Sequence, residues 1–166
     1  GEPITTDQVM GIYGARLQVD DAVASGVEVR LQVSWLRFLP NAEQVLEVLY
    51  RYAPRHPRVV AVYLVGREDN DKGYPLRFLD TLRELRKTYS GVQLSIHAGE
   101  VDEPNYHVRD TLLLGADRIG HGVNLITDPA TLIDMRYGPY LVEINLISNL
   151  LLEYITDYDQ HPFPEY

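Results

Sequence analysis

Short apolar runs alternate with amphipathic segments along this chain, and that alternation limits its fold more than any other feature. The ends of successive runs, at Arg37, Gly66, His97, His121 and Leu146, are 29, 31, 24 and 25 residues apart. This is the length of one strand followed by one helix, so consecutive strands would lie parallel and be joined by right-handed crossovers. We expect five strands, at 27–33, 59–65, 92–96, 117–120 and 140–144.

Helix signals lie in the segments between these runs. Asp128 followed by Pro129, for example, is typical of a helix start. We expect helices at 6–25, 41–54, 75–85, 108–114 and 129–138, and a further one after the fifth strand. Four leucines recur at three-residue spacing, and we assign them to the core: Leu76, Leu79, Leu82 and Leu85. The sequence therefore predicts an α/β fold with a parallel sheet, as a single domain over residues 1–166.

The composition excludes several classes of protein. The 166 residues carry 24 acidic and 15 basic side chains, for a net charge of −9. We expect no nucleic acid partner, because phosphate backbones bind to basic faces. The absence of cysteine excludes disulfide scaffolds and thiolate sites, but it does not decide between a cytoplasmic and a secreted protein. No apolar run reaches the roughly 18 residues of a membrane helix, so we expect no membrane partner.

A histidine and a glutamate follow the end of the third apolar run, in the segment His97-Ala98-Gly99-Glu100. Functional groups of parallel α/β folds gather at these carboxyl ends. A neutral imidazole at His97 could bind a metal ion. The two small residues after it would let the chain turn sharply, so that Glu100 returns to the same site. A base beside a metal-bound water is typical of hydrolytic metal sites.

Two further segments lie at strand ends. In Arg118-Ile119-Gly120-His121-Gly122, the flanking glycines leave room around the imidazole of His121. In Leu64-Val65-Gly66, a glycine exposes its backbone N–H to a ligand. Taken singly, each feature is more often structural: a hydrogen-bonded histidine, a turn or a solvated acidic loop. Two histidines and one glutamate at the matched ends of consecutive strands favour the functional interpretation.

These segments together resemble the adenosine deaminase family, within the metal-dependent amidohydrolase superfamily. The resemblance rests on His97–Glu100 followed one strand–helix unit later by Arg118–Gly122. Residues 64–69 are similar to the family's fourth-strand segment, particularly in its secreted, growth-factor-like branch, and residues 143–149 to its seventh-strand segment. The family fold is a (β/α)₈ barrel. The resemblance therefore implies an incomplete TIM barrel whose five strands are the third to the seventh.

The resemblance also implies roles for four residues. His97 is similar to a zinc ligand, and Glu100 to the carboxyl group that protonates the purine ring as hydroxide attacks. His121 is similar to the histidine that orients and deprotonates the zinc-bound water, and Gly66 to the glycine whose backbone N–H meets the purine. The implied cofactor is Zn²⁺. The implied reaction is hydrolytic deamination of adenosine or 2′-deoxyadenosine to inosine or 2′-deoxyinosine, with release of ammonia.

Other parts of the family's zinc site have no counterpart in this sequence. The family uses a His-x-His on its first strand and an Asp-Asp on its eighth, whereas the only Asp-Asp here, Asp20-Asp21, precedes a helix-like stretch. A barrel of this type needs about 250 residues, and catalytic zinc usually takes three protein ligands and a water. We therefore expect this chain to be part of a longer or proteolysed polypeptide. The missing strands would come from the rest of that polypeptide or another chain, and the isolated chain would be inactive.

Three functions stay open for the parent protein. It is part of an active zinc-dependent adenosine deaminase, a degenerate relative that serves as a binding or growth-factor-like module, or a related amidohydrolase acting on another purine. Tyr63 stands where the family often has aspartate, and Asn145-Leu146 replace its usual Cys-Pro, which bears on the substrate more than on the reaction.

Three polar residues outside the motifs are given structural interpretations. His107 is expected on a helix surface and His161 in a loop, so neither is taken as a metal ligand. Asn149, with Ser148, could either orient groups of the site or cap the next helix.

Overall fold

The computed structural model describes residues 5, 8, 11, 12, 15, 16, 26–101 and 106–166. Its strands are β1 (Leu31–Leu36), β2 (Val59–Val65), β3 (Gln93–Ala98), β4 (Arg118–His121) and β5 (Leu141–Glu143). The longer helices are α2 (Ala42–Tyr52), α3 (Leu79–Thr88), α4 (His107–Leu113), α5 (Pro129–Tyr137) and α6 (Leu146–Leu151). The helix expected at 6–25 lies largely outside the described residues.

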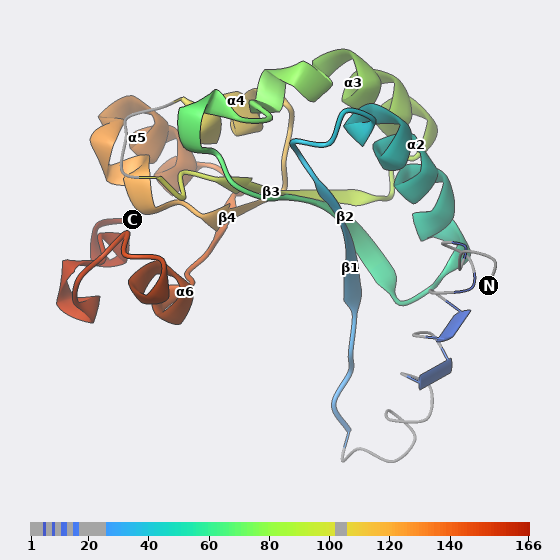
Figure 1. The fold of residues 1–166 in the computed structure, drawn as a ribbon, viewed down its shortest axis with the longest axis horizontal. Coiled ribbons are helices and arrows are strands. Elements are labelled where there is room, and N and C mark those ends of the chain that lie inside the picture. The colour runs from blue at the N-terminus through green and yellow to red at the C-terminus, as the bar shows by residue number, and fades with distance from the viewer. Residues whose placement is uncertain (1–4, 6–7, 9–10, 13–14, 17–25, 102–105) are drawn as a thin grey trace.

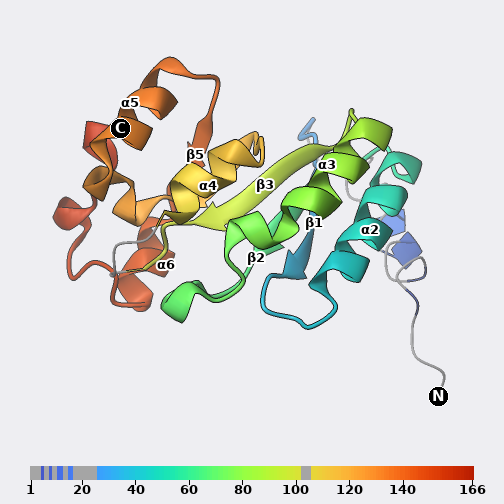
Figure 2. The same cartoon turned by 90° about the horizontal axis from the view of Figure 1, so that it is seen from above.

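The five strands form one sheet in the order β1-β2-β3-β4-β5, and every neighbouring pair is parallel. Each strand therefore lies beside the next one in the chain, which is the order of successive strands in a (β/α)₈ barrel. Helices α2, α3 and α4 lie over the same face of the sheet (Figures 1 and 2). The predicted parallel α/β sheet is confirmed, and this architecture is consistent with part of a (β/α)₈ barrel.

The first strand differs from its predicted bounds. It begins at Leu31, where its pairing with Val59 of β2 starts, and it continues to Leu36. Residues 27–30 are not in a strand, although their alternating pattern suggested one. The pattern was misleading because β2 itself begins at Val59 and offers these residues no partner.

The core lies between the helices and one face of the sheet. Buried side chains of α2 and α3 pack over those of the strands, among them Leu46, Leu82, Leu94, Ile96 and Ile119. Each such side chain contributes roughly 1.5–3 kcal/mol on burial.

The four leucines assigned to the core do not share one environment. Leu82 is buried, and Leu79 and Leu85 pack against the core while remaining partly exposed. Leu76 is exposed, because residues 75–78 form a 3₁₀ turn rather than the first turn of α3. Phe78 takes the buried position in that turn and meets Trp35 edge-on, with 5.9 Å between ring centroids.

Side chains alternate between the two faces of the sheet along each strand. The face opposite the core carries several polar side chains. Leu94 and Ile96 of β3 point into the core, whereas Ser95 and His97 lie on the other face with Tyr63 of β2. Among the described helices, none is long and apolar enough to cross a membrane.

Candidate active site

Three of the four predicted site residues meet at the carboxyl ends of β3 and β4. His97 is paired in register with Gly120, and Ala98 with His121, so the two imidazoles project from neighbouring strand ends. Their ring centroids are 4.5 Å apart and their planes are nearly perpendicular. The parallel pairing of adjacent strands thus brings together two histidines that are 24 residues apart in sequence.

Glu100 completes this cluster from the turn that follows β3. One carboxylate oxygen lies 3.0 Å from Nδ1 of His121, and the other lies 4.0 Å from Nδ1 of His97. Each of the three residues offers a potential ligand atom within 4.8 Å of the other two. The predicted return of Glu100 to the histidine site therefore agrees with the geometry.

Two glycines make this arrangement sterically possible. Gly99 adopts φ +80°, and a Cβ there would collide with the side-chain oxygen of Asn124. A Cβ at Gly120 would collide with the Tyr63 hydroxyl and would lie 2.7 Å from Cδ2 of His97. The first glycine permits the turn to Glu100, and the second leaves space for the His97 ring.

The electrostatics of the cluster suit a metal ion. Burial, together with the nearby His121, lowers the pKa of His97 to about 4, so its imidazole is neutral at pH 7. Neutral imidazole is the form that binds metals. Within the described part of the chain, the buried Nδ1 of His97 has no hydrogen-bond partner. Buried polar atoms normally have partners, so this nitrogen fits the ligand set of a divalent cation.

His121 is held by a chain of buried amide and imidazole groups. Nδ2 of Asn149 in α6 lies 3.1 Å from Nδ1 of His121, and the side-chain oxygen of Asn149 lies 3.3 Å from Nε2 of His161. Asn145, not Asn149, occupies the N-cap position of α6. The orienting interpretation of Asn149 therefore agrees with the structure better than the capping one. His161 lies in the predicted non-helical region but is buried.

Gly66 directly follows β2 and lies beside the ring of Phe38. Among the described residues, the side chains nearest to Gly66 are those of Phe38 and Arg37 rather than those of the His97–Glu100–His121 cluster, and its role in binding stays a prediction.

His107 was expected on a helix surface, and that expectation is wrong. It is 2% exposed, and its ring nitrogens lie 2.7 Å from Glu68 and 2.6 Å from Asp71. Glu68, the acceptor, is also buried and was not singled out from the sequence. The one available signal was its position three residues after the end of β2, among polar residues.

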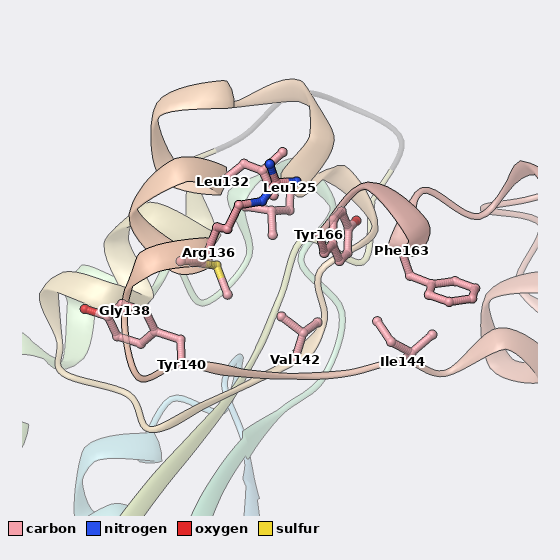
Figure 3. A pocket seen from close by; sticks show the side chains of 10 residues that line it. Leu125, Leu132, Arg136, Gly138, Tyr140, Val142, Ile144, Phe163 and Tyr166 are labelled. Atoms are coloured by element: carbon pink, nitrogen blue, oxygen red, sulfur yellow. The ribbon is translucent and has the colours of Figure 1, made fainter.

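A separate pocket of about 360 Å³ lies beside β5 and α5 (Figure 3). Its lining is mostly apolar and includes Leu132, Tyr140, Val142 and Phe163. None of the clustered histidine or glutamate residues lines it, so we do not assign it to the candidate active site.

A parallel α/β sheet with clustered metal-ligand residues at its strand ends is typical of barrel enzymes. A family model for adenosine deaminase matches residues 4–166. The chain is 31% identical over 108 residues to an adenosine deaminase of Clostridium kluyveri, an alignment covering 65% of this chain and 30% of that protein.

Two solved structures are also similar. An adenine deaminase of Arthrobacter aurescens superposes with a TM-score of 0.81 at 21% identity, covering 98% of this chain and 48% of that one. An Arabidopsis ADAL protein complexed with IMP superposes with a TM-score of 0.68 at 26% identity, covering 82% of this chain and 38% of that one. The chain belongs to the adenosine deaminase family. It spans less than half the length of these relatives.

Proposed function

We propose that this chain supplies part of the active site of a zinc-dependent purine deaminase. The reaction would be hydrolytic deamination of adenosine or 2′-deoxyadenosine to inosine or 2′-deoxyinosine, with release of ammonia. The observation that carries this proposal is the convergence of His97, Glu100 and His121 within 4.8 Å at neighbouring strand ends. Membership of the family supplies the reaction class.

His97 would hold the zinc ion with its neutral imidazole. The bound ion would lower the pKa of a water molecule and so make hydroxide available at neutral pH. His121 would orient the attacking water and accept its proton, and the contact with Asn149 would hold the ring in place. Glu100 would give a proton to the purine ring, and the backbone N–H of Gly66 would contact the purine.

The complete active site would need strands beyond the five that the structure describes. Catalytic zinc usually has three protein ligands and an open position for water, and among the described strands β1 and β5 each pair with a single neighbour. We propose that the described sheet is one partial-barrel domain. Its companion strands would come from the rest of a longer polypeptide or from another chain, and the isolated 166 residues would be inactive.

The substrate could be another purine. The similarity to an adenine deaminase and to a protein solved with IMP supports adenine or a purine nucleotide as alternatives. A net charge of −9 weighs against a nucleotide, whose phosphate favours basic surroundings. A place in the secreted, growth-factor-like branch rests only on the segment from Leu64 to Asp69.

The direct test is ammonia release by the complete natural polypeptide that carries this chain. We expect release from adenosine, its loss on metal chelation, and a fall of about 10²–10⁴-fold in Glu100→Gln. Glu84→Gln is the matched control, because the Glu84 side chain is 71% exposed and pairs with Lys87 on the surface of α3. Adenine and AMP, assayed in parallel, identify the substrate. A folded, zinc-free protein that deaminates none of them would instead favour the degenerate binding module.

A further inference from the structure

A buried carboxylate holds the backbone of the turn that carries Glu100. Glu68, which follows β2, is 1% exposed. It accepts hydrogen bonds from the backbone N–H of Gly99 at 3.0 Å and from that of Glu100 at 3.2 Å. The main chain at Glu100 is therefore fixed from the neighbouring strand end, 32 residues away in sequence.

A buried cation holds the other end of the same turn. Arg37, which follows β1, is fully buried, and its Nη1 donates to the backbone carbonyl of His97 at 2.8 Å. Its Nε donates to the carbonyl of Gly73, and its guanidinium lies 3.6 Å from Glu68. Both ends of the segment from His97 to Glu100 are thus bound to a pair of opposite charges.

His107 anchors that pair from α4. Both of its ring nitrogens lie against carboxylates, Nδ1 against Glu68 and Nε2 against Asp71. Burial alone would lower the pKa of His107, but these two hydrogen bonds raise it, which favours the doubly protonated imidazolium. Burial likewise opposes ionisation of Glu68, yet the hydrogen bond from His107 and the charge of Arg37 lower its pKa.

Such a cluster is an inefficient way to stabilise a fold. Several kcal/mol are needed to desolvate each buried ion, and hydrophobic replacements of buried ion pairs are often neutral or stabilising. The cluster instead fixes the position of the backbone next to the candidate active site, because its hydrogen bonds end on the main-chain atoms of His97, Gly99 and Glu100.

We infer that Glu68 and His107 are positioning residues, which fix the backbone of Gly99 and Glu100 so that the Glu100 carboxylate faces the two imidazoles. The inference rests on the proposed function for its catalytic consequence. A displacement of about 1 Å in a reacting group can lower a rate about 10²-fold. Loss of the contact between Glu68 and the two N–H groups should therefore reduce catalysis more than substrate binding.

The test uses Glu68→Gln in the complete natural polypeptide. An amide side chain has only one accepting oxygen, so one of the two N–H groups loses its acceptor. We expect the amide protons of Gly99 or Glu100 to exchange at least about tenfold faster than in wild type. We expect kcat for purine deamination to fall about 10²-fold, with KM changed less than about threefold.

Two other variants keep the experiment decisive. Asp80→Asn removes the same charge from a side chain that is 93% exposed, and it should leave exchange and kcat unchanged. If Glu68→Gln does not fold, His107→Gln takes its place. We then expect faster exchange of the same amide protons and a fold-reduction in kcat about one tenth as large as that expected for Glu68→Gln.

Unchanged exchange and unchanged kcat in the folded variants would overturn the inference while leaving the proposed function intact. A wild-type protein that deaminates no purine would overturn the proposed function. The exchange rates of Gly99 and Glu100 would still show whether Glu68 and His107 hold the turn.

Discussion

The ring of His97 packs between two other aromatic rings. Its ring meets the ring of Tyr63 edge-on at 4.8 Å and that of His121 at 4.5 Å. The Tyr63 hydroxyl donates to Glu143 at 2.7 Å, so the tyrosine is itself fixed. A Cβ at Gly120 would collide with both the Tyr63 hydroxyl and the His97 ring, so the orientation of His97 depends on the absence of a side chain there.

Gly120→Ala should therefore disturb the site directly. The added methyl group would push against the Tyr63 hydroxyl and the His97 ring, at a cost of about 1–3 kcal/mol in unfolding free energy. We expect weaker zinc binding and lower deaminase activity. Gly91→Ala is the matched control, because a Cβ there meets nothing within 4 Å. Equal effects of the two substitutions, measured by denaturant unfolding and zinc titration, would contradict this packing argument.

Asn149 offers a second test at the residue scale. Asn149→Ala removes the donor to His121 and the acceptor for His161, so we expect activity to fall about 10–100-fold. Asn41→Ala serves as the control, because Asn41 occupies the N-cap position before α2 and its side chain makes no capping hydrogen bond. Steady-state kinetics would contradict the orienting role if the Asn149 variant retained wild-type kcat.

The succession of strands and helices could be predicted from sequence because it depends on local periodicity. The same holds for the meeting of His97, Glu100 and His121, which follows from adjacent parallel strand ends. The environment of His107 could not be predicted, because its partners Glu68 and Asp71 lie 39 and 36 residues away and its own helix gives no sign of them. The predicted start of β1 was wrong for a similar reason, because the start of β1 depends on where its partner β2 begins.

The contact of α4 with the β2–α3 segment should depend on pH through His107. Its neighbours there are Glu68, Asp71 and Arg37, and the net effect raises its pKa. A histidine whose pKa is higher in the folded than in the unfolded state stabilises the fold when it is protonated. This stabilisation is complete below the unfolded pKa of about 6.5 and is lost as the pH rises through the folded pKa. We expect the difference in unfolding free energy between wild type and His107→Gln to shrink between about pH 6 and pH 9. Denaturant melts across that range measure it, and a difference that grew with pH would have the wrong sign.

Among the described strands, β1 and β5 each leave one edge of the sheet open. The sheet of a (β/α)₈ barrel is closed by further strands, and this chain spans only 30–48% of an adenosine deaminase and an adenine deaminase that resemble it. The sequence could not predict a complete set of ligands for the proposed zinc ion, because none of its histidines has the family's His-x-His spacing.

The isolated 166-residue chain should consequently bind zinc more weakly than the complete natural polypeptide and release no ammonia from adenosine. Zinc titration and an ammonia assay on both proteins, side by side, measure this difference. Full activity of the isolated chain would show that the companion strands are not required.

Anomalous diffraction at the zinc edge, from crystals of the complete natural polypeptide, would locate the proposed metal ion directly. We expect one strong peak about 2.0–2.1 Å from a ring nitrogen of His97, with Glu100 and His121 facing the same ion. Zinc bound elsewhere, or a site at His97 that stays empty at saturating zinc, would contradict it.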